Sequence, residues 1–188
     1  ALTFGFAIKN NAIDGSIPSQ LGQLTSLTQD LYLHTNALSG SIPTELGLSN
    51  LKIQFVLNDN SLTGAIPTEL GNMQSLTQGF QIVGNKLTGP VPSELGQMTG
   101  FTFYFSLRSN ELTRSIPSEL GQMTQITDTF IMALNKLTGP VPSELGQLSL
   151  LTNGFAFYAN SLTSSIPTEL GGLTGLTAYF TLSSSELT

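Results

Sequence analysis

The sequence LTGPVPSELGQ, residues 87–97, recurs in near-identical form from one end of the chain to the other. The proline that precedes its Ser-Glu-Leu or Thr-Glu-Leu motif (Ser-Gln-Leu in the first copy) lies at 18, 43, 67, 92, 117, 142 and 167, so neighbouring copies are 24 or 25 residues apart. Self-similarity at a fixed period in the twenties is typical of solenoids, in which each coil buries its apolar side only by stacking on its neighbours. The sequence therefore predicts a single elongated array over residues 1–188, with about 7.5 repeats.

The composition argues against several classes of function. The chain has 12 acidic and 6 basic residues, and its net charge of −6 would repel nucleic acid and anionic lipid. It contains no cysteine, which excludes disulfides and thiolate metal sites. No run of about 18 apolar residues occurs, so we expect no membrane insertion.

The two ends of the sequence resemble interior repeats. The chain opens with ALTFGF, already inside a unit, and closes with SSSELT, just before the next Ile-Pro pair would begin. Solenoids normally have polar capping units, because terminal coils expose core and unpaired strand edges. We therefore interpret the chain as an uncapped segment of a longer protein, and end-to-end self-association into fibres is one consequence that we expect from such ends.

One segment of each unit alternates apolar and variable residues, which is typical of a strand with one buried face. The first inward column holds Phe6, Leu31, Phe55, Phe80, Phe105, Phe130, Phe155 and Phe180. The second inward column holds Ile8, Leu33, Leu57, Ile82, Leu107, Met132, Phe157 and Leu182. Stacking one such strand per coil predicts a parallel sheet with strands about 4.8 Å apart.

Two further positions of the unit predict turns. An asparagine follows the strand at 11, 36, 60, 85, 110, 135 and 160, and we expect its side chain to hydrogen-bond backbone groups that the turn leaves unpaired. Ser185 takes this position in the last unit, which predicts fraying at the C-terminal edge. The Ile-Pro pair predicts a short helical turn, with glutamate near its positive end and the following glycine ending it.

The unit NxLTGxIPxELGxLTxL resembles the plant-specific class of leucine-rich repeat, and the likeness covers essentially the whole chain. The resemblance implies a right-handed α/β solenoid with a concave parallel sheet and short helical turns or loops on the convex side. It also implies a protein, peptide or glycan partner on the concave face and an extracellular or cell-surface location. The unit has 25 residues instead of the usual number of about 24, and we expect a bulge or a wider corner before the sheet to absorb the extra residue.

The variable positions of the strand segment mark the predicted binding surface. There, size, polarity and charge change while the rest of the unit repeats, which indicates either a ligand or neutral drift. The predicted ligand-binding residues are Tyr32, His34, Asn58, Gln81, Val83, Tyr104, Ser106, Arg108, Ile131 and Tyr158. Tyrosine and arginine are residue types that anchor interfaces. We expect Arg108 to lie near Asp59 or Glu111, and Val83, Ile131, Ala133 and Leu134 to form an apolar contact patch.

Rows of hydroxyl side chains support a second hypothesis, ice binding. Serine or threonine lies beside the glutamate column at 19, 44, 68, 93, 118, 143 and 168, and threonine recurs at 3, 28, 77, 102, 127, 152 and 177. In several ice-binding proteins, regular threonine rows on a flat solenoid face order surface water, and the rows in this chain resemble them. The alternative is structural, since threonine is favoured near strands and serine or threonine near helix starts.

The inventory of side chains does not favour catalysis. His34 is the only histidine and there is no cysteine, so Cys-His dyads cannot form. The repeated glutamates form one row, whereas paired glycosidase carboxylates face each other across a cleft. We therefore predict a recognition or scaffold segment that is not an enzyme, with no catalytic residue, no metal site and no cofactor.

Overall fold

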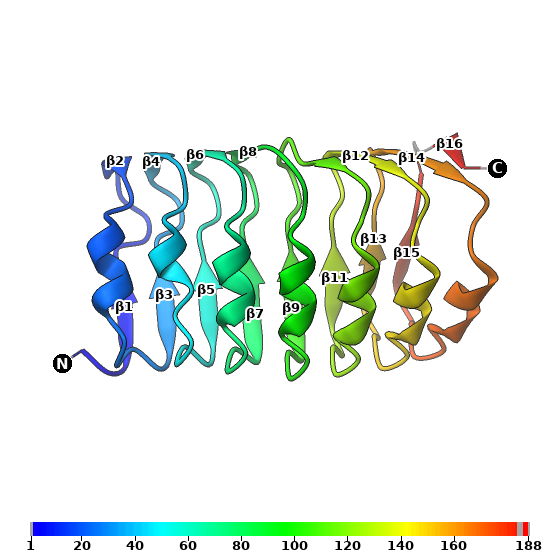
Figure 1. The fold of residues 1–188 in the computed structure, drawn as a ribbon, viewed down its shortest axis with the longest axis horizontal. Helices are drawn as coiled ribbons and strands as arrows, with labels where there is room; N and C mark the ends of the chain where they lie inside the picture. Colours follow the sequence, from blue (N-terminus) through cyan, green and yellow to red (C-terminus); the bar gives the residue numbers. More distant parts are fainter. Residues whose placement is uncertain (1, 184–185, 188) are drawn as a thin grey trace.

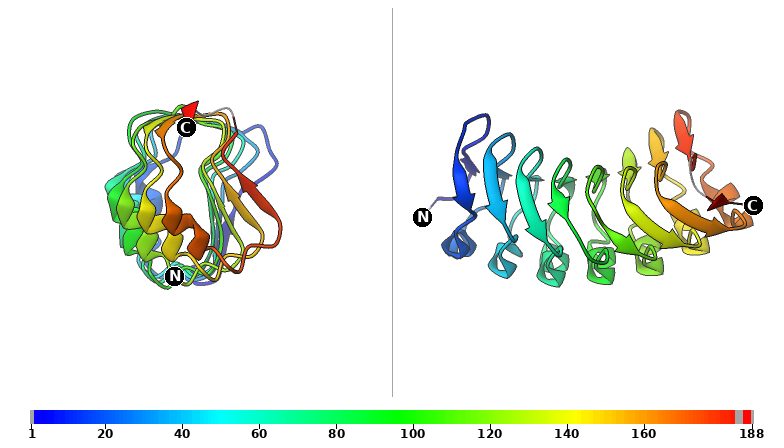
Figure 2. Two further views of the ribbon diagram at one scale, coloured as in Figure 1. Left: turned by 90° about the vertical axis from the view of Figure 1, so that its right-hand side faces the viewer. Right: turned by 90° about the horizontal axis from the view of Figure 1, so that it is seen from above.

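The computed structural model describes residues 2–183 and 186–187, and shows one continuous solenoid (Figure 1). Each coil contributes one strand to a parallel sheet with the order β1-β3-β5-β7-β9-β11-β13-β15. These strands are β1 Gly5–Ala7, β3 Asp30–Tyr32, β5 Gln54–Val56, β7 Gln78–Gln81, β9 Phe103–Ser106, β11 Thr129–Ile131, β13 Gly154–Ala156 and β15 Tyr179–Thr181. Seen from above, the array bends so that this sheet lines the concave side (Figure 2, right). The predicted architecture is confirmed, whereas the fraying expected at Ser185 lies outside the described residues.

A second row of short parallel strands, which the sequence did not predict, runs along one edge of the solenoid (Figure 1). It forms two sheets with the orders β2-β4-β6-β8 and β10-β12-β14-β16. These strands are β2 Asp14–Ser16, β4 Ala37–Gly40, β6 Ser61–Gly64, β8 Lys86–Leu87, β10 Thr113–Arg114, β12 Lys136–Gly139, β14 Ser161–Ser164 and β16 Glu186–Leu187. Stacking of adjacent coils creates these ladders, because each strand pairs only with strands about one repeat away.

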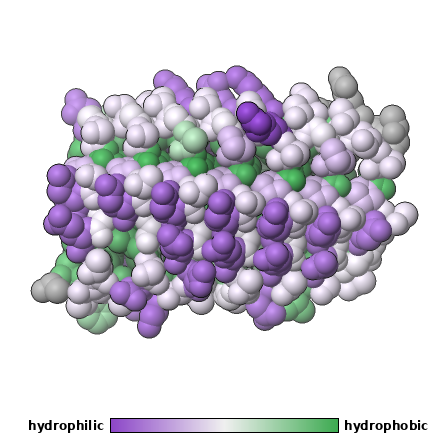
Figure 3. Space-filling model, viewed as in Figure 1, coloured by the Kyte–Doolittle hydropathy of each residue, from purple (hydrophilic) through white to green (hydrophobic). Residues whose placement is uncertain are grey.

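The convex side consists of 3-10 helices, one per coil. They are η1 Ser19–Gln23, η2 Thr44–Leu46, η3 Thr68–Asn72, η4 Ser93–Gln97, η5 Ser118–Gln122, η6 Ser143–Gln147 and η7 Thr168–Gly172. The proline before each helix holds φ near −65°, as a helix start requires. Hydrophilic side chains form regular rows over this face (Figure 3), in agreement with the exposed glutamate column.

The prediction that glycine ends each helical turn is wrong for most coils. Gly96 lies inside η4, and the helix ends at Gln97, with Met98 as its C-cap residue. A Cβ atom on Gly96 would lie 2.3 Å from the carbonyl oxygen of Glu119, which belongs to the next coil. The glycine is therefore needed because two backbones approach closely there, and its φ is not in the left-handed region.

Both predicted inward columns fill the interior. Phe55, Phe80, Phe105, Phe130 and Phe155 are completely buried, and their rings stack from coil to coil. The centroid of the Phe105 ring lies 5.2 Å from that of Phe80 and 5.1 Å from that of Phe130. Offset stacking of this kind adds about 0.5–1.5 kcal/mol per pair to the gain from burial. At the terminal coils Phe6 is half-buried and Phe180 is 43% exposed.

The extra residue of each unit is absorbed just before the sheet, as predicted. The amides of Asn153 and Gly154 both donate to the carbonyl oxygen of Asp128, at 2.9 and 3.1 Å. The paired residues stay 25 apart on both sides of this point, from Thr127 and Thr152 to Thr129 and Gly154, so the extra residue lies in a wider corner that both coils share. The arrangement recurs elsewhere, since the amides of Thr102 and Phe103 both donate to the carbonyl of Thr77.

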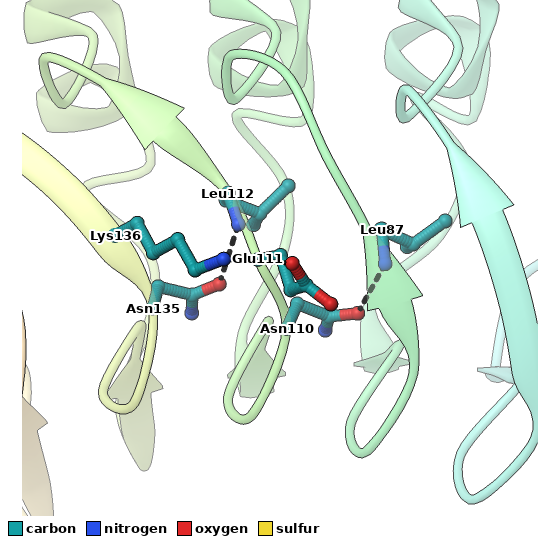
Figure 4. Close-up of polar contacts among 6 residues, drawn as sticks. All are labelled: Leu87, Asn110, Glu111, Leu112, Asn135 and Lys136. Carbon is teal, nitrogen blue, oxygen red and sulfur yellow. Dashed lines mark hydrogen bonds and ion pairs between the residues drawn. The ribbon is translucent and has the colours of Figure 1, made fainter.

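The asparagine ladder ties adjacent coils together (Figure 4). The Nδ2 group of Asn110 donates to the carbonyl of Ile82 in the preceding coil at 2.7 Å and to that of Leu107 in its own coil at 3.2 Å. Its Oδ1 accepts the backbone amide of Leu87, again in the preceding coil, at 3.2 Å. Each buried amide thus pairs backbone groups of two coils, which confirms the predicted structural role.

The hydroxyl rows are also used within the protein. The Oγ1 group of Thr127 donates to the carbonyl of Thr102 at 2.9 Å, and Thr102 repeats this contact to Thr77. In the other row, Ser93 Oγ donates to Glu94 Oε2 of the same helix at 3.3 Å. The hydroxyl protons of these threonines are therefore directed to the backbone of the neighbouring coil.

Candidate functional site

Variable side chains form three columns across the concave sheet, and each strand contributes one residue to each column. Because side chains alternate along a strand, the residues one before, one after and three after the buried phenylalanine all point away from the core. The sequence prediction used mainly the last two columns. The structure divides the predicted residues into three groups along the sheet.

The first group surrounds Tyr32 at the N-terminal end of the sheet. The Tyr32 and His34 rings meet edge to face, with centroids 5.7 Å apart. Lys9 Nζ lies 4.4 Å from the centroid of the Tyr32 ring, a cation–π contact. Burial raises the pKa of the Tyr32 hydroxyl, and the nearby carboxylate of Asp30 adds to the effect. The contacts among Lys9, Tyr32 and His34 hold this cluster together.

The pKa of the His34 imidazole lies below its ordinary value of 6.5, mainly because burial disfavours the charged form. The positive charge of Lys9 lowers this pKa further, whereas the carboxylate of Asp59 acts in the opposite direction.

His34 is the only histidine, so its proton NMR resonances can be followed without assignment ambiguity. We expect a titration midpoint below 6.5, raised by Lys9→Met and lowered further by Asp59→Asn. A depressed histidine pKa contributes stability above pH 6.5 that is lost as the pH falls, and His34→Gln should remove this small pH dependence. A midpoint at or above 6.5 would contradict the described environment.

The second group lies in the middle of the sheet and is internally satisfied. Asn58 Nδ2 donates to Gln81 Oε1 at 3.0 Å, and Asn58 Oδ1 accepts the backbone amide of Val83 at 2.8 Å. Two of the predicted polar ligand residues, Asn58 and Gln81, therefore have part of their hydrogen-bonding capacity engaged by each other. This region offers fewer free polar groups than the sequence suggested.

The third group lines a hollow of about 580 Å³ over the C-terminal half of the sheet. Four predicted residues meet there: Tyr104, Arg108, Ile131 and Tyr158. The other lining residues are Asp128, Thr129, Asn153, Gly154, Ala156, Tyr179 and Thr181. Tyr32, His34, Asn58, Gln81, Val83 and Ser106 lie outside it.

Five of the residues that the sequence prediction missed precede the phenylalanines of the first inward column. Thr129, Gly154 and Tyr179 come one residue before Phe130, Phe155 and Phe180, and Asp128 and Asn153 come two residues before. The same alternation that identified Ile131 would have identified Thr129, Gly154 and Tyr179, had it been extended toward the N-terminus of each strand. Asp128 and Asn153 belong to the corner before the strand, so no periodicity places them.

Three expectations for the concave face are wrong. Ser106 is only 1% exposed and Ala133 is fully buried, because larger neighbours in the adjoining strands cover these small side chains. The patch expected from Val83, Ile131, Ala133 and Leu134 therefore lacks Ala133 as a contact residue. Glu111 pairs with Lys136 Nζ at 2.7 Å instead of with Arg108 (Figure 4), and both partners of this pair are largely exposed.

Tyr104 has an unusual backbone conformation at the edge of the hollow. Its φ is +60°, in the left-handed region that non-glycine residues rarely adopt. The corresponding residue of the preceding coil is Gly79, with a φ of +66°. A left-handed non-glycine residue costs about 1–2 kcal/mol, and strain of this kind is concentrated at functional sites. Because glycine adopts this conformation at the equivalent position, the backbone at Tyr104 can accommodate glycine without strain.

The described residues contain no group of three or more histidine, cysteine, aspartate or glutamate side chains placed to hold a metal ion. Over the same part of the chain, no helix is long and apolar enough to cross a membrane. The groups that line the hollow are tyrosine rings, a guanidinium, a carboxylate and an apolar floor.

Comparisons with known proteins place this geometry in a structural class. Neither a protein-family model nor a curated relative matches the sequence. Among solved structures, the chain is similar to the leucine-rich-repeat ectodomain of the plant membrane receptor kinase GASSHO1/SCHENGEN3 from Arabidopsis thaliana, solved in complex with CASPARIAN STRIP INTEGRITY FACTOR 2. The identity is 33% and the TM-score 0.87, and the match covers 95% of this chain and 21% of the receptor chain.

Two further structures extend the comparison. The plant peptide hormone receptor RGFR1, in complex with RGF2, is 39% identical with a TM-score of 0.86, over 94% of this chain and 27% of the receptor chain. A plant ice-binding protein matches at 24% identity and a TM-score of 0.67, over 96% of this chain and 72% of that one, which shows the fold alone. The chain thus spans about a fifth to a quarter of the receptor chains. With its repeating unit, its stacked parallel strands and these neighbours, the chain is a leucine-rich-repeat protein.

Proposed function

We propose that the chain recognises a peptide or a short protein segment in the hollow on its concave sheet. The observation on which this depends is the convergence of Tyr104, Tyr158, Tyr179 and Arg108 around one apolar floor. Tyrosine and arginine dominate the binding energy of protein interfaces. A volume of about 580 Å³ falls within the range of about 300–1,000 Å³ that is typical of ligand pockets.

The comparisons support peptide recognition in preference to the glycan alternative. Both receptor structures were solved in complex with a named factor, and RGFR1 is a plant peptide hormone receptor. These are properties of the neighbours, of which this chain covers about a quarter or less. By the same likeness we propose an extracellular or cell-surface location and a binding role rather than an enzymatic one.

Ice binding has weaker support from the side chains. The threonine row donates its hydroxyl protons to backbone carbonyls of the preceding coil, as Thr127 does to Thr102, so its regularity has a structural cause. The residue-level observations therefore favour recognition over ice binding.

Tyr104→Gly tests the proposed function, with peptides selected from a random heptapeptide library displayed on phage as the probe. Glycine adopts the left-handed conformation of Tyr104 without strain, as Gly79 does in the preceding coil. The variant should therefore keep the fold while losing one ring of the hollow. We expect about a thirtyfold loss of affinity for the selected peptides, measured by isothermal titration calorimetry.

Tyr32→Ala is the matched control, because it removes a tyrosine ring from the same sheet outside the hollow. We expect this control to change the affinity by less than about twofold, since Tyr32 contacts Lys9 and His34 instead. The melting temperature of Tyr104→Gly should equal or exceed that of Tyr104→Ala. Equal losses at Tyr32 and Tyr104, or failure of the library to yield any binder, would refute the proposed site.

A further inference from the structure

The hollow has different chemistry at its two ends. Asp128 and Asn153 lie two residues before the buried phenylalanines of their coils, and Arg108 and Tyr158 lie three residues after theirs. Five residues of extended chain correspond to about 16 Å along the strand direction. One end of the hollow is thus acidic and the other basic, and Ile131, Gly154 and Ala156 form the floor between them.

Asp128 is a nearly buried carboxylate without a cation. The residue is 8% exposed, and its Oδ1 accepts a hydrogen bond from Asn153 Nδ2. Among the described residues, an ion pair joins Lys136 to Glu111, and none joins Asp128 to a basic side chain. Removing an ionised carboxylate from water without such a partner is unfavourable. A cationic group of a ligand would restore the missing interaction.

Arg108 offers the complementary charge at the opposite end. Its side chain is exposed, and within the described residues no acidic side chain pairs with it. A guanidinium binds a carboxylate in a forked, two-bond geometry, which favours a defined orientation of the partner. Because Arg108 is exposed, its pairing energy is smaller than that of a buried group and is screened by salt.

The floor between the charged ends suits an uncharged segment. Gly154 and Ala156 are buried and leave room above the strand, while Ile131 provides an apolar contact. The hydroxyl groups of Tyr104, Tyr158 and Tyr179 stand around this floor and can hydrogen-bond a peptide backbone. A lone arginine and a carboxylate are a poor match for a polyanion, and the mixture of charges instead matches a peptide with both signs.

We propose that the hollow binds an extended peptide segment with a basic side chain at Asp128 and an acidic side chain at Arg108, separated by about three or five uncharged residues, because side chains an even number of positions apart face the same side of an extended chain. This inference rests on the proposed function, because it names the peptide class that the same hollow accepts. No strand edge pairs with the ligand on the face of a sheet, so either chain direction satisfies the two charges. The spacing and the signs of the charges are therefore what the hollow selects.

The heptapeptide library tests this inference through the sequences that it enriches. On the wild-type chain, we expect binders with one basic and one acidic residue about four or six positions apart to be enriched about tenfold over isomers with adjacent charges. Selection on Asp128→Asn should lose the preference for the basic residue only. Selection on Arg108→Gln should lose the preference for the acidic residue only.

Two matched variants make the same chemical changes away from the hollow. Asp59→Asn alters an exposed carboxylate at the N-terminal part of the array, and Arg114→Gln alters an exposed guanidinium on β10. Neither should change the enriched pattern. For a widely spaced binder, calorimetry should show about a tenfold affinity loss with Asp128→Asn and about a threefold loss with Arg108→Gln, the latter diminishing at high salt.

The outcomes separate this inference from the function on which it rests. Binders that need Tyr104 but lack the charge pattern, or keep it on both hollow variants, would overturn the charge-spacing inference and leave peptide recognition standing. A library that yields no binder would overturn both. Enrichment of the widely spaced pattern, lost one charge at a time in the two hollow variants, would establish the peptide class.

Discussion

Asn110→Ala is expected to destabilise the chain by about 4 kcal/mol, the largest effect of any single substitution argued for this protein. The side chain is 7% exposed and hydrogen-bonds the carbonyls of Ile82 and Leu107 and the amide of Leu87. Alanine would leave the carbonyl of Ile82 and the amide of Leu87 without these partners, whereas the carbonyl of Leu107 would keep its hydrogen bond from Asn135. Each buried group left unpaired costs about 1–3 kcal/mol, so the sum of several exceeds the cost of one lost contact.

The expected loss can be measured from urea unfolding followed by circular dichroism. Asn11→Ala is the matched control, since Asn11 occupies the same position in the first coil but is exposed and bonds only to carbonyls of its own coil. We expect its cost to stay below about 1 kcal/mol, because water can replace an exposed partner. Asn110→Asp should be intermediate, as it keeps the acceptor and loses the donor. Similar costs for Asn11 and Asn110 would show that cross-coil bonding is unimportant.

The periodic part of the fold could be predicted from the sequence because the signal is local and repeated. The Phe105 and Leu107 positions alternate with variable residues in every coil, and this alternation fixes which side of the strand is buried. Asn110 was also predictable, since a buried turn leaves backbone groups that a side-chain amide can satisfy. These assignments required only the chemistry of one unit and the fact of stacking.

Features that arise between coils could not be predicted in this way. The second row of strands has only two to four residues per coil and exists because neighbouring coils pair. Ser106 is buried by the sizes of its neighbours on adjacent strands, which vary from coil to coil. Asp128 and Asn153 reach the hollow from the corner that absorbs the extra residue of the unit. In each case the cause lies about one repeat away in sequence.

The glycine of the 3-10 helix shows the same limitation, and it gives the second large expected effect. Gly96→Ala should destabilise the chain by about 3 kcal/mol, near the upper end of the usual cost of overpacking. The new Cβ would lie 2.3 Å from the carbonyl oxygen of Glu119 and 2.6 Å from its carbonyl carbon. Both atoms belong to backbone, so no side-chain rotation can relieve the contact. The coils would have to separate against the phenylalanine stack and the asparagine ladder.

Gly171→Ala separates this clash from the intrinsic effect of the substitution. Gly171 occupies the equivalent position in η7, the last 3-10 helix, and a Cβ there would meet no atom within 4 Å. Alanine loses less backbone entropy on folding than glycine, so this control should be neutral or stabilising by up to about 1 kcal/mol. Opposite signs for the two variants in urea unfolding would show that stacking distance, and not helix termination, requires glycine at this position. If Gly96→Ala is as well tolerated as Gly171→Ala, the coils are not in rigid contact, and the spacing that aligns Asp128 with Arg108 across the hollow would be adjustable too.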